Sequence, residues 1–156
     1  MNLRLRVFLA AILAIAAAPS MPALAAGKAV PFSRLSAVVR TEPHEVRVGA
    51  GFTLGKDSKG IDPITQPATI RLDKLLFAVP PNSFRKTDLG WFAYSGTIGG
   101  NAVEIEIIPV ENNSFILRAE IAGKKFKTPA PGAIKVQISV GNDVGVVETR
   151  AWQAWY

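Results

Sequence analysis

Strict alternation of apolar and polar residues is the feature that most constrains the fold of this chain. The stretch AIKVQISVG (133–141) places its β-branched residues at every second position, and NSFILRAEIAG (113–123) repeats the pattern. Successive side chains of a β-strand point to opposite faces of a sheet. This spacing therefore predicts strands that bury one face and leave the other to water.

Turn signals separate these alternating runs at regular intervals. The pair Gly99–Gly100 divides WFAYSGTIGGNAVEIEIIPV (91–110) into two strands, because the tight hairpin turns that match strand twist need positive φ angles. We count seven or eight strands, about 8–12 residues apart, and no amphipathic helix. The pattern predicts an all-β fold, an antiparallel β-sandwich of the immunoglobulin-like or a related kind, over residues 46–156.

The N-terminus has the three parts of a secretory signal peptide. A basic start, MNLRLR, precedes an apolar run of 12 residues, VFLAAILAIAAA, and small residues at Ala23 and Ala25 form an A-x-A cleavage site. We expect residues 1–25 to be removed after Ala25, although Ala26 would also serve. A retained interfacial helix is the alternative, since the run is shorter than the roughly 20 residues of a membrane span. The sequence predicts an exported protein, periplasmic or secreted.

The mature chain of 131 residues contains neither cysteine nor methionine. It therefore forms no disulfide, and no thiolate can act as a nucleophile or metal ligand. Its net charge is +4, because 16 basic residues face 12 acidic ones, with a cluster at Lys124, Lys125 and Lys127. Without a recognition helix this charge does not predict nucleic-acid binding. Residues 26–45 contain two prolines and no sustained period, which predicts a tether. Within it, RLSAVVR (34–40) could make a short strand or one helical turn.

The segment GKDSKGIDP (55–63) admits three interpretations. A phosphate cradle needs a helix after the glycines, and Pro63 and Pro67 forbid a long one. A calcium loop could use Asp57, Ser58 and Asp62 around a turn at Gly60, but two lysines would repel the cation. A plain turn stabilised by Asp and Gly residues is the interpretation we favour, and calcium binding stays open.

Four short pieces occur in a fixed order over about residues 50–149. They are Gly60-Ile61-Asp62-Pro63, Val79-Pro80-Pro81-Asn82-Ser83-Phe84, Tyr94-Ser95-Gly96-Thr97-Ile98-Gly99-Gly100 and Val140-Gly141-Asn142-Asp143-Val144-Gly145. In these pieces and their order the chain resembles a β-repeat unit of large exported bacterial proteins of unknown function. The chain departs from the pattern at Asn82, where glycine is usual, and by carrying one copy. The resemblance implies an exported β-module and supplies no activity.

Residues for catalysis are few. His44 is the single histidine, and no G-x-S-x-G elbow is present to supply a nucleophilic serine. One histidine without cysteine falls short of a zinc site. Glu104 and Glu106 share one face of a strand and could form a glycosidase pair in a cleft. On a solvated face they would instead pair with Arg118 or Lys135 across the sheet. We predict no enzyme activity, no cofactor and no metal.

The C-terminal AWQAWY brings three aromatic residues together, Trp152, Trp155 and Tyr156. We expect a last strand whose rings close the core, with contact to a ligand or partner as the alternative. An outer-membrane barrel is a weaker alternative, because charges and glycines interrupt the apolar band that its strands need.

The sequence thus predicts an exported, non-catalytic β-module with a binding or structural role at the cell envelope. A small hydrolase of envelope polymers is the alternative from another class. Neither nucleic acid nor stable membrane insertion is expected. Self-association through unpaired edge strands is a possible mode of interaction.

Overall fold

A computed structural model describes residues 27–153 of the chain. The expected signal peptide with its cleavage site at Ala23, Ala25 and Ala26 lies outside the described residues, as do Trp155 and Tyr156. The described part forms eleven strands. They are β1 (Val30–Pro31), β2 (Arg34–Glu42), β3 (Glu45–Thr53), β4 (Ala68–Leu72), β5 (Leu75–Val79), β6 (Arg85–Lys86), β7 (Phe92–Ile98), β8 (Asn101–Pro109), β9 (Ser114–Ala122), β10 (Gly132–Val140) and β11 (Asp143–Gln153).

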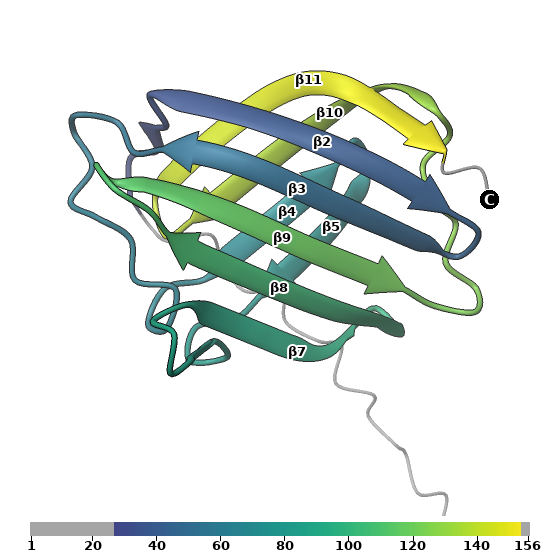
Figure 1. Ribbon diagram of the computed structural model, residues 1–156, viewed down its shortest axis with the longest axis horizontal. Coiled ribbons are helices and arrows are strands. Elements are labelled where there is room, and N and C mark those ends of the chain that lie inside the picture. Colours follow the sequence, from purple (N-terminus) through teal and green to yellow (C-terminus); the bar gives the residue numbers. More distant parts are fainter. Residues whose placement is uncertain (1–26, 154–156) are drawn as a thin grey trace, which may run out of the picture.

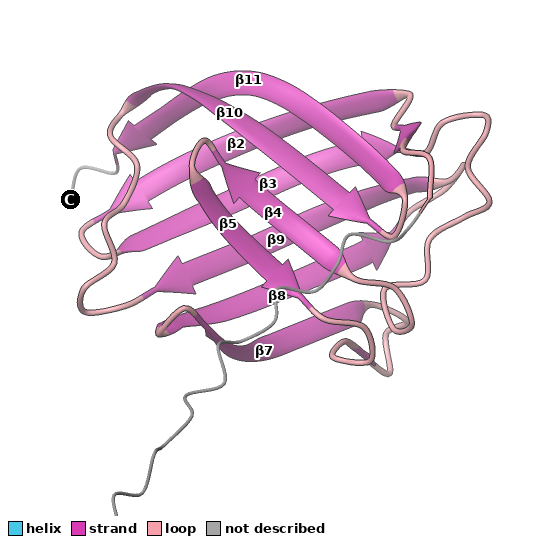
Figure 2. Cartoon of the chain, turned by 180° about the vertical axis from the view of Figure 1, so that it is seen from behind, coloured by secondary structure: helices cyan, strands magenta, loops and turns pink. Residues whose placement is uncertain are grey.

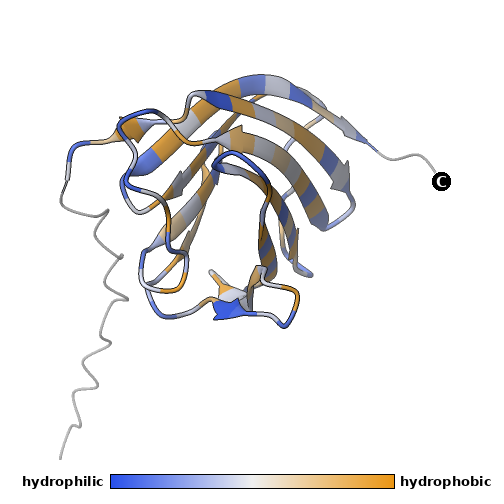
Figure 3. Cartoon of the chain, turned by 60° about the vertical axis from the view of Figure 1, so that its left-hand side comes forward, coloured by the Kyte–Doolittle hydropathy of each residue, from blue (hydrophilic) through white to orange (hydrophobic). Residues whose placement is uncertain are grey.

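The eleven strands form one sheet within the described residues, in the order β5-β4-β10-β11-β2-β3-β9-β8-β7-β6, with β1 beside β11 (Figure 1). All pairs are antiparallel except β1–β11 and β11–β2. The sheet curls into a half-barrel, and Figure 3 shows it as an arch. The all-β prediction is confirmed. The prediction of a seven- or eight-stranded sandwich is wrong, because β11 joins the two halves of the structure into one continuous sheet.

The concave face of the half-barrel holds the core, as the alternation predicts. In β10 every second side chain from Ile134 to Val140 is buried, and β8 and β9 follow the same rule. A stack of rings extends the core, with Phe52 between Phe32 at 4.5 Å and Phe115 at 5.3 Å. Gly145 of β11 makes room for this stack, because a Cβ there would collide with the ring of Phe32.

The predicted tether over residues 26–45 is not observed. Its second half is β2, a central strand that pairs with β3 along its whole length, from Arg34↔Thr53 to Glu42↔Glu45. The period-2 pattern is present here, since Val39 and Thr41 are buried. It was hidden because neighbouring apolar residues, Ala37 and Val38, interrupt the visible alternation, and Val38 lies exposed on the outer face.

The two halves of the sheet meet at a short parallel seam. Three residues of β11, Ala151–Gln153, pair with Val39–Thr41 of β2. Two side chains reinforce it: Thr149 Oγ1 donates to the carbonyl of Ala37 at 2.9 Å, and Thr41 Oγ1 donates to that of Trp152 at 3.5 Å. Among residues 27–153 no helix has the length and apolar character of a membrane span.

Ile138 offers a test of the core, because it is fully buried in the centre of β10. We expect Ile138→Ala to lower the free energy of unfolding by about 2–5 kcal/mol, through lost burial and the cavity left behind. Val146→Ala is the matched control on the adjacent strand, since Val146 is 51% exposed. It should change stability by less than about 0.5 kcal/mol. Urea titration followed by tryptophan fluorescence measures both, and equal effects would contradict this assignment of faces.

Candidate binding groove

A groove of about 940 Å³ crosses the outer face of β3, β9, β8 and β7. The segment around β6, from Ser83 to Thr87, forms its wall at the edge of the sheet. Seven charged side chains line the groove, four basic and three acidic. They are Arg47, Arg85, Lys86, Arg118, Glu104, Glu106 and Glu120.

Strand register aligns these side chains in two rows across the sheet. The first row runs Arg47, Glu120, Glu104 and Ser95, and the second runs Gly49, Arg118, Glu106 and Ala93. Because the period is two, each residue of a row points to the outer face while its sequence neighbours fill the core. Three of the four row ends, Ser95, Gly49 and Ala93, carry small side chains or none and leave space for the groove.

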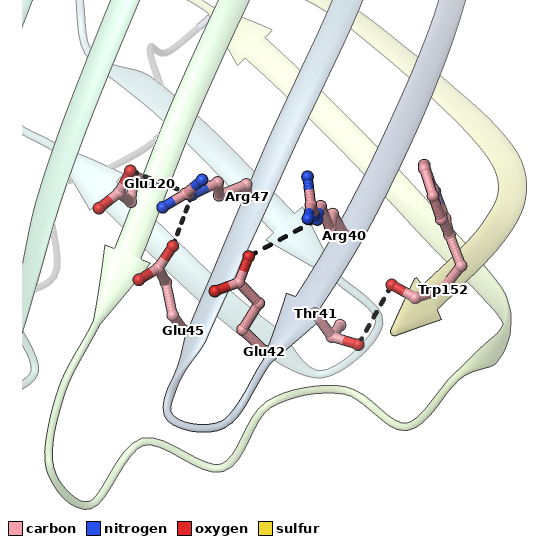
Figure 4. A network of polar contacts seen from close by, with 7 residues as sticks. All are labelled: Arg40, Thr41, Glu42, Glu45, Arg47, Glu120 and Trp152. Atoms are coloured by element: carbon pink, nitrogen blue, oxygen red, sulfur yellow. Dashed lines mark hydrogen bonds and ion pairs between the residues drawn. The ribbon is translucent and has the colours of Figure 1, made fainter. Parts of the chain in front are cut away.

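Arg47 is held by two carboxylates (Figure 4). Its Nε lies 2.5 Å from Glu45 Oε1 and 3.2 Å from Glu120 Oε2. Both carboxylates raise the pKa of Arg47, and Glu45 has the larger effect. Across the next row Arg118 Nη1 lies 3.9 Å from Glu106 Oε2. The predicted partnership of Glu106 with Arg118 is therefore confirmed, whereas Lys135 lies on β10, away from the groove.

Three charged groups of the groove have no ion-pair partner among residues 27–153. Glu104 stands directly opposite Glu120, a pairing of like charges that costs stability. On the far wall, Arg85 and Lys86 are exposed. These three groups offer one anion and two cations to a molecule lying in the groove.

The candidate catalytic residues are only partly brought together. Glu104 and Glu106 both line the groove, but His44 does not. His44 occupies the turn between β2 and β3 at φ 65°, and its Nδ1 lies 3.4 Å from the carbonyl oxygen of Phe126. The hydrolase hypothesis needs these residues in one pocket, and this placement separates the histidine from the carboxylates.

In the GKDSKGIDP loop the side chain of Asp62 bonds to the loop itself. Its Oδ2 accepts a hydrogen bond from Thr65 Oγ1 at 2.7 Å, and its Oδ1 accepts one from the amide of Ile64 at 3.1 Å. Ser58 Oγ accepts from the amide of Gly60, which has φ 91°. The described residues contain no group of three or more His, Cys, Asp and Glu side chains placed to hold a metal. These bonds are those of a side-chain-stabilised turn.

Trp152 is 54% exposed on the outer face of β11, so its ring does not close the core as expected. The odd-numbered positions of β11 face inward, and Ala151 takes the buried site at the seam. Trp152 pairs in register with Arg40 of β2, and Figure 4 draws both side chains on the same side of the sheet. Its proposed contact with a ligand or partner stays a prediction.

The lysine cluster lies at a second, smaller groove of about 640 Å³. Lys124, Lys125 and Lys127 come from the β9–β10 loop, and strand β5 and the β7–β8 turn provide the other walls. The sequence singled out these lysines as a cluster, but it did not place β5 beside them.

Comparisons with known protein families, curated proteins and solved structures found no match to this chain. The resemblance to a β-repeat unit of exported proteins stays a prediction.

The hydrogen bonds of Asp62 make the stability of the fold depend on pH. The hydroxyl of Thr65 is the main cause that lowers the pKa of the Asp62 carboxyl below 3.8. A carboxyl group whose pKa is lower in the folded chain stabilises the fold above about pH 4 and loses this contribution as the pH falls through the folded value. We expect Asp62→Asn to lower the melting temperature at pH 7, by an amount that shrinks towards about pH 2.

Asp57→Asn serves as the matched control in the same loop, because Asp57 is exposed and the structure gives its carboxylate no hydrogen bond. Thermal unfolding followed by circular dichroism across this pH range makes the measurement. If Asp62→Asn lowered the melting temperature equally at every pH, the charge of the carboxylate would not be the source of the stabilisation.

Proposed function

We propose that the protein is an exported, non-catalytic module that binds an extended, charged partner at the cell envelope through the outer groove. The observation that carries this proposal is the set of charges that form no ion pair among residues 27–153, Glu104 on β8 and Arg85 and Lys86 on the far wall. The N-terminal sequence supports export, and the β-rich composition fits a module that presents a rigid surface.

The shape of the groove favours a chain-like ligand. It crosses four strands and stays open to solvent, so that a linear molecule can lie along it without entering an enclosed cavity. Its rigid strands hold the charges at fixed spacing, which lowers the entropic cost of binding. Groups of both signs suit a polymer that carries carboxylates and amines, as the peptide stems of peptidoglycan do.

The carboxylates are poorly suited to hydrolysis. A general acid needs a shielded site that keeps its proton near neutral pH. The side chains of Glu106 and Glu120 are 42% and 46% exposed, and each contacts an arginine. These two carboxylates therefore lack the shielded site that a general acid needs.

Co-sedimentation with purified peptidoglycan tests the proposal. We expect residues 26–156 to sediment with the polymer, and Arg85→Glu combined with Lys86→Glu to weaken binding by about tenfold or more. Each reversal replaces an attraction worth about 0.2–1 kcal/mol by a repulsion of similar size. Lys56→Glu with Lys59→Glu is the matched control, because it changes the net charge equally at two exposed lysines outside the groove.

Two results would contradict the proposal. Release of soluble fragments from the polymer, abolished by Glu104→Gln, would make the protein a hydrolase. Equal loss of binding in both double variants would mean that net charge alone, and not the groove, holds the polymer.

A further inference from the structure

The half-barrel leaves two unpaired strand edges within the described residues. At one end of the sheet, β5 pairs only with β4. At the other end, the two-residue β6 covers only Phe92 and Ala93 of β7, so that Tyr94–Ile98 has a free edge. Figure 2 shows the β4–β5 hairpin crossing in front of the concave face, above β7 and β8.

Strand β5 lacks the features that usually protect an edge. Its sequence, LLFAV, contains no charge and no proline, whereas natural edges are usually blocked by charges, prolines or bulges. The two-residue turn Asp73–Lys74 joins β4 to β5. In a hairpin with such a turn the flanking residues, here Leu72 and Leu75, form backbone hydrogen bonds with each other. Bonding alternates along an antiparallel pair, so the N–H and C=O groups of Leu76 and Ala78 point away from β4.

The second groove lies along this edge and supplies a charge preference. Leu75, Leu76 and Phe77 form its apolar wall, and no carboxylate is among its lining residues. Lys124, Lys125 and Lys127 are exposed at its rim, and none of them forms an ion pair with a residue in the described part of the chain. The groove thus combines free backbone groups, apolar surface and three unneutralised positive charges.

We propose that β5 is a docking edge for an extended acidic segment of another protein, which adds to the sheet as a further strand. Its backbone would pair with Leu76 and Ala78, its apolar side chains would cover the part-exposed Leu75 and Leu76, and its carboxylates would contact the lysines. This mode of recognition draws affinity from main-chain hydrogen bonds and specificity from side chains. The site lies apart from the outer groove, so it does not depend on the function proposed for that groove.

Charge complementarity favours an acidic partner over a second copy of this chain. In an antiparallel pair of β5 strands each copy would bring its own three lysines and no acidic group to the groove. Residues 1–25 are also excluded as the occupant on charge, because they carry two arginines and no carboxylate.

Peptide binding measured by fluorescence anisotropy tests the proposal on residues 26–156. The probe is a labelled nine-residue peptide of alternating valine and threonine with two glutamates at one end, compared with the same peptide ending in two lysines. We expect the acidic peptide to bind about threefold to tenfold more tightly at low salt, as two exposed ion pairs would give. Lys124→Glu with Lys125→Glu should reverse this preference, whereas Arg85→Glu with Lys86→Glu, in the other groove, should not.

Ala78→Pro tests the strand edge itself. Proline removes an N–H that points away from β4, so the β4–β5 pairing is kept while peptide binding should fall by at least about tenfold. Hydrogen exchange of the unmodified protein gives a second readout that needs no variant. The amides of Leu76 and Ala78 should become protected when the acidic peptide is added, while those of Tyr94–Ile98 on β7 stay unchanged.

Three outcomes would overturn the proposal. These are equal binding of the acidic and basic peptides, protection on β7 in place of β5, and absence of binding at millimolar peptide. A dimer in light scattering that Ala78→Pro dissociates would assign the edge to a second copy and would equally exclude the acidic partner.

Discussion

The parallel pairing of β11 with β2 is the contact on which the half-barrel depends. Without it the strands would fall into two antiparallel groups, β5-β4-β10-β11 and β2-β3-β9-β8-β7-β6. The seam spans only three residues of each strand, yet Val39 and Ala151 are buried there and two threonine hydroxyls bond across it. With no disulfide available, packing, backbone pairing and these side-chain hydrogen bonds maintain the curl.

Both candidate sites follow from this curl. Curling turns one face of every strand into the core, and the charged alternate residues of β3, β8 and β9 are left together on the outside, where they line the larger groove. The arch stops before the two ends of the sheet pair with each other, so β5 retains a free edge beside the lysine loop. The outer groove depends on side chains, whereas the edge depends mainly on backbone groups.

The sequence predicted the strands better than their arrangement. The alternation in β8, β9 and β10 correctly identified buried faces, and the Gly99–Gly100 pair correctly marked a hairpin. Strand β2 was expected only as a short strand or helical turn within a tether, because Ala37 and Val38 interrupt the pattern. The seam could not be predicted, because pairing between distant strands leaves no local signal. Glu104, Glu106 and Arg118 were identified as charged neighbours, but Arg47, Arg85 and Lys86 reach the groove only through tertiary register.

The seam also sets the order in which the fold can be completed. Thr149 of β11 bonds to Ala37 of β2 across 112 positions of the chain. Early-synthesised β2 therefore has no partner on that side until nearly all the other strands have been made, and contacts this distant slow folding. The seam is therefore a late contact, which can form only after β11 at the end of the described residues has been synthesised.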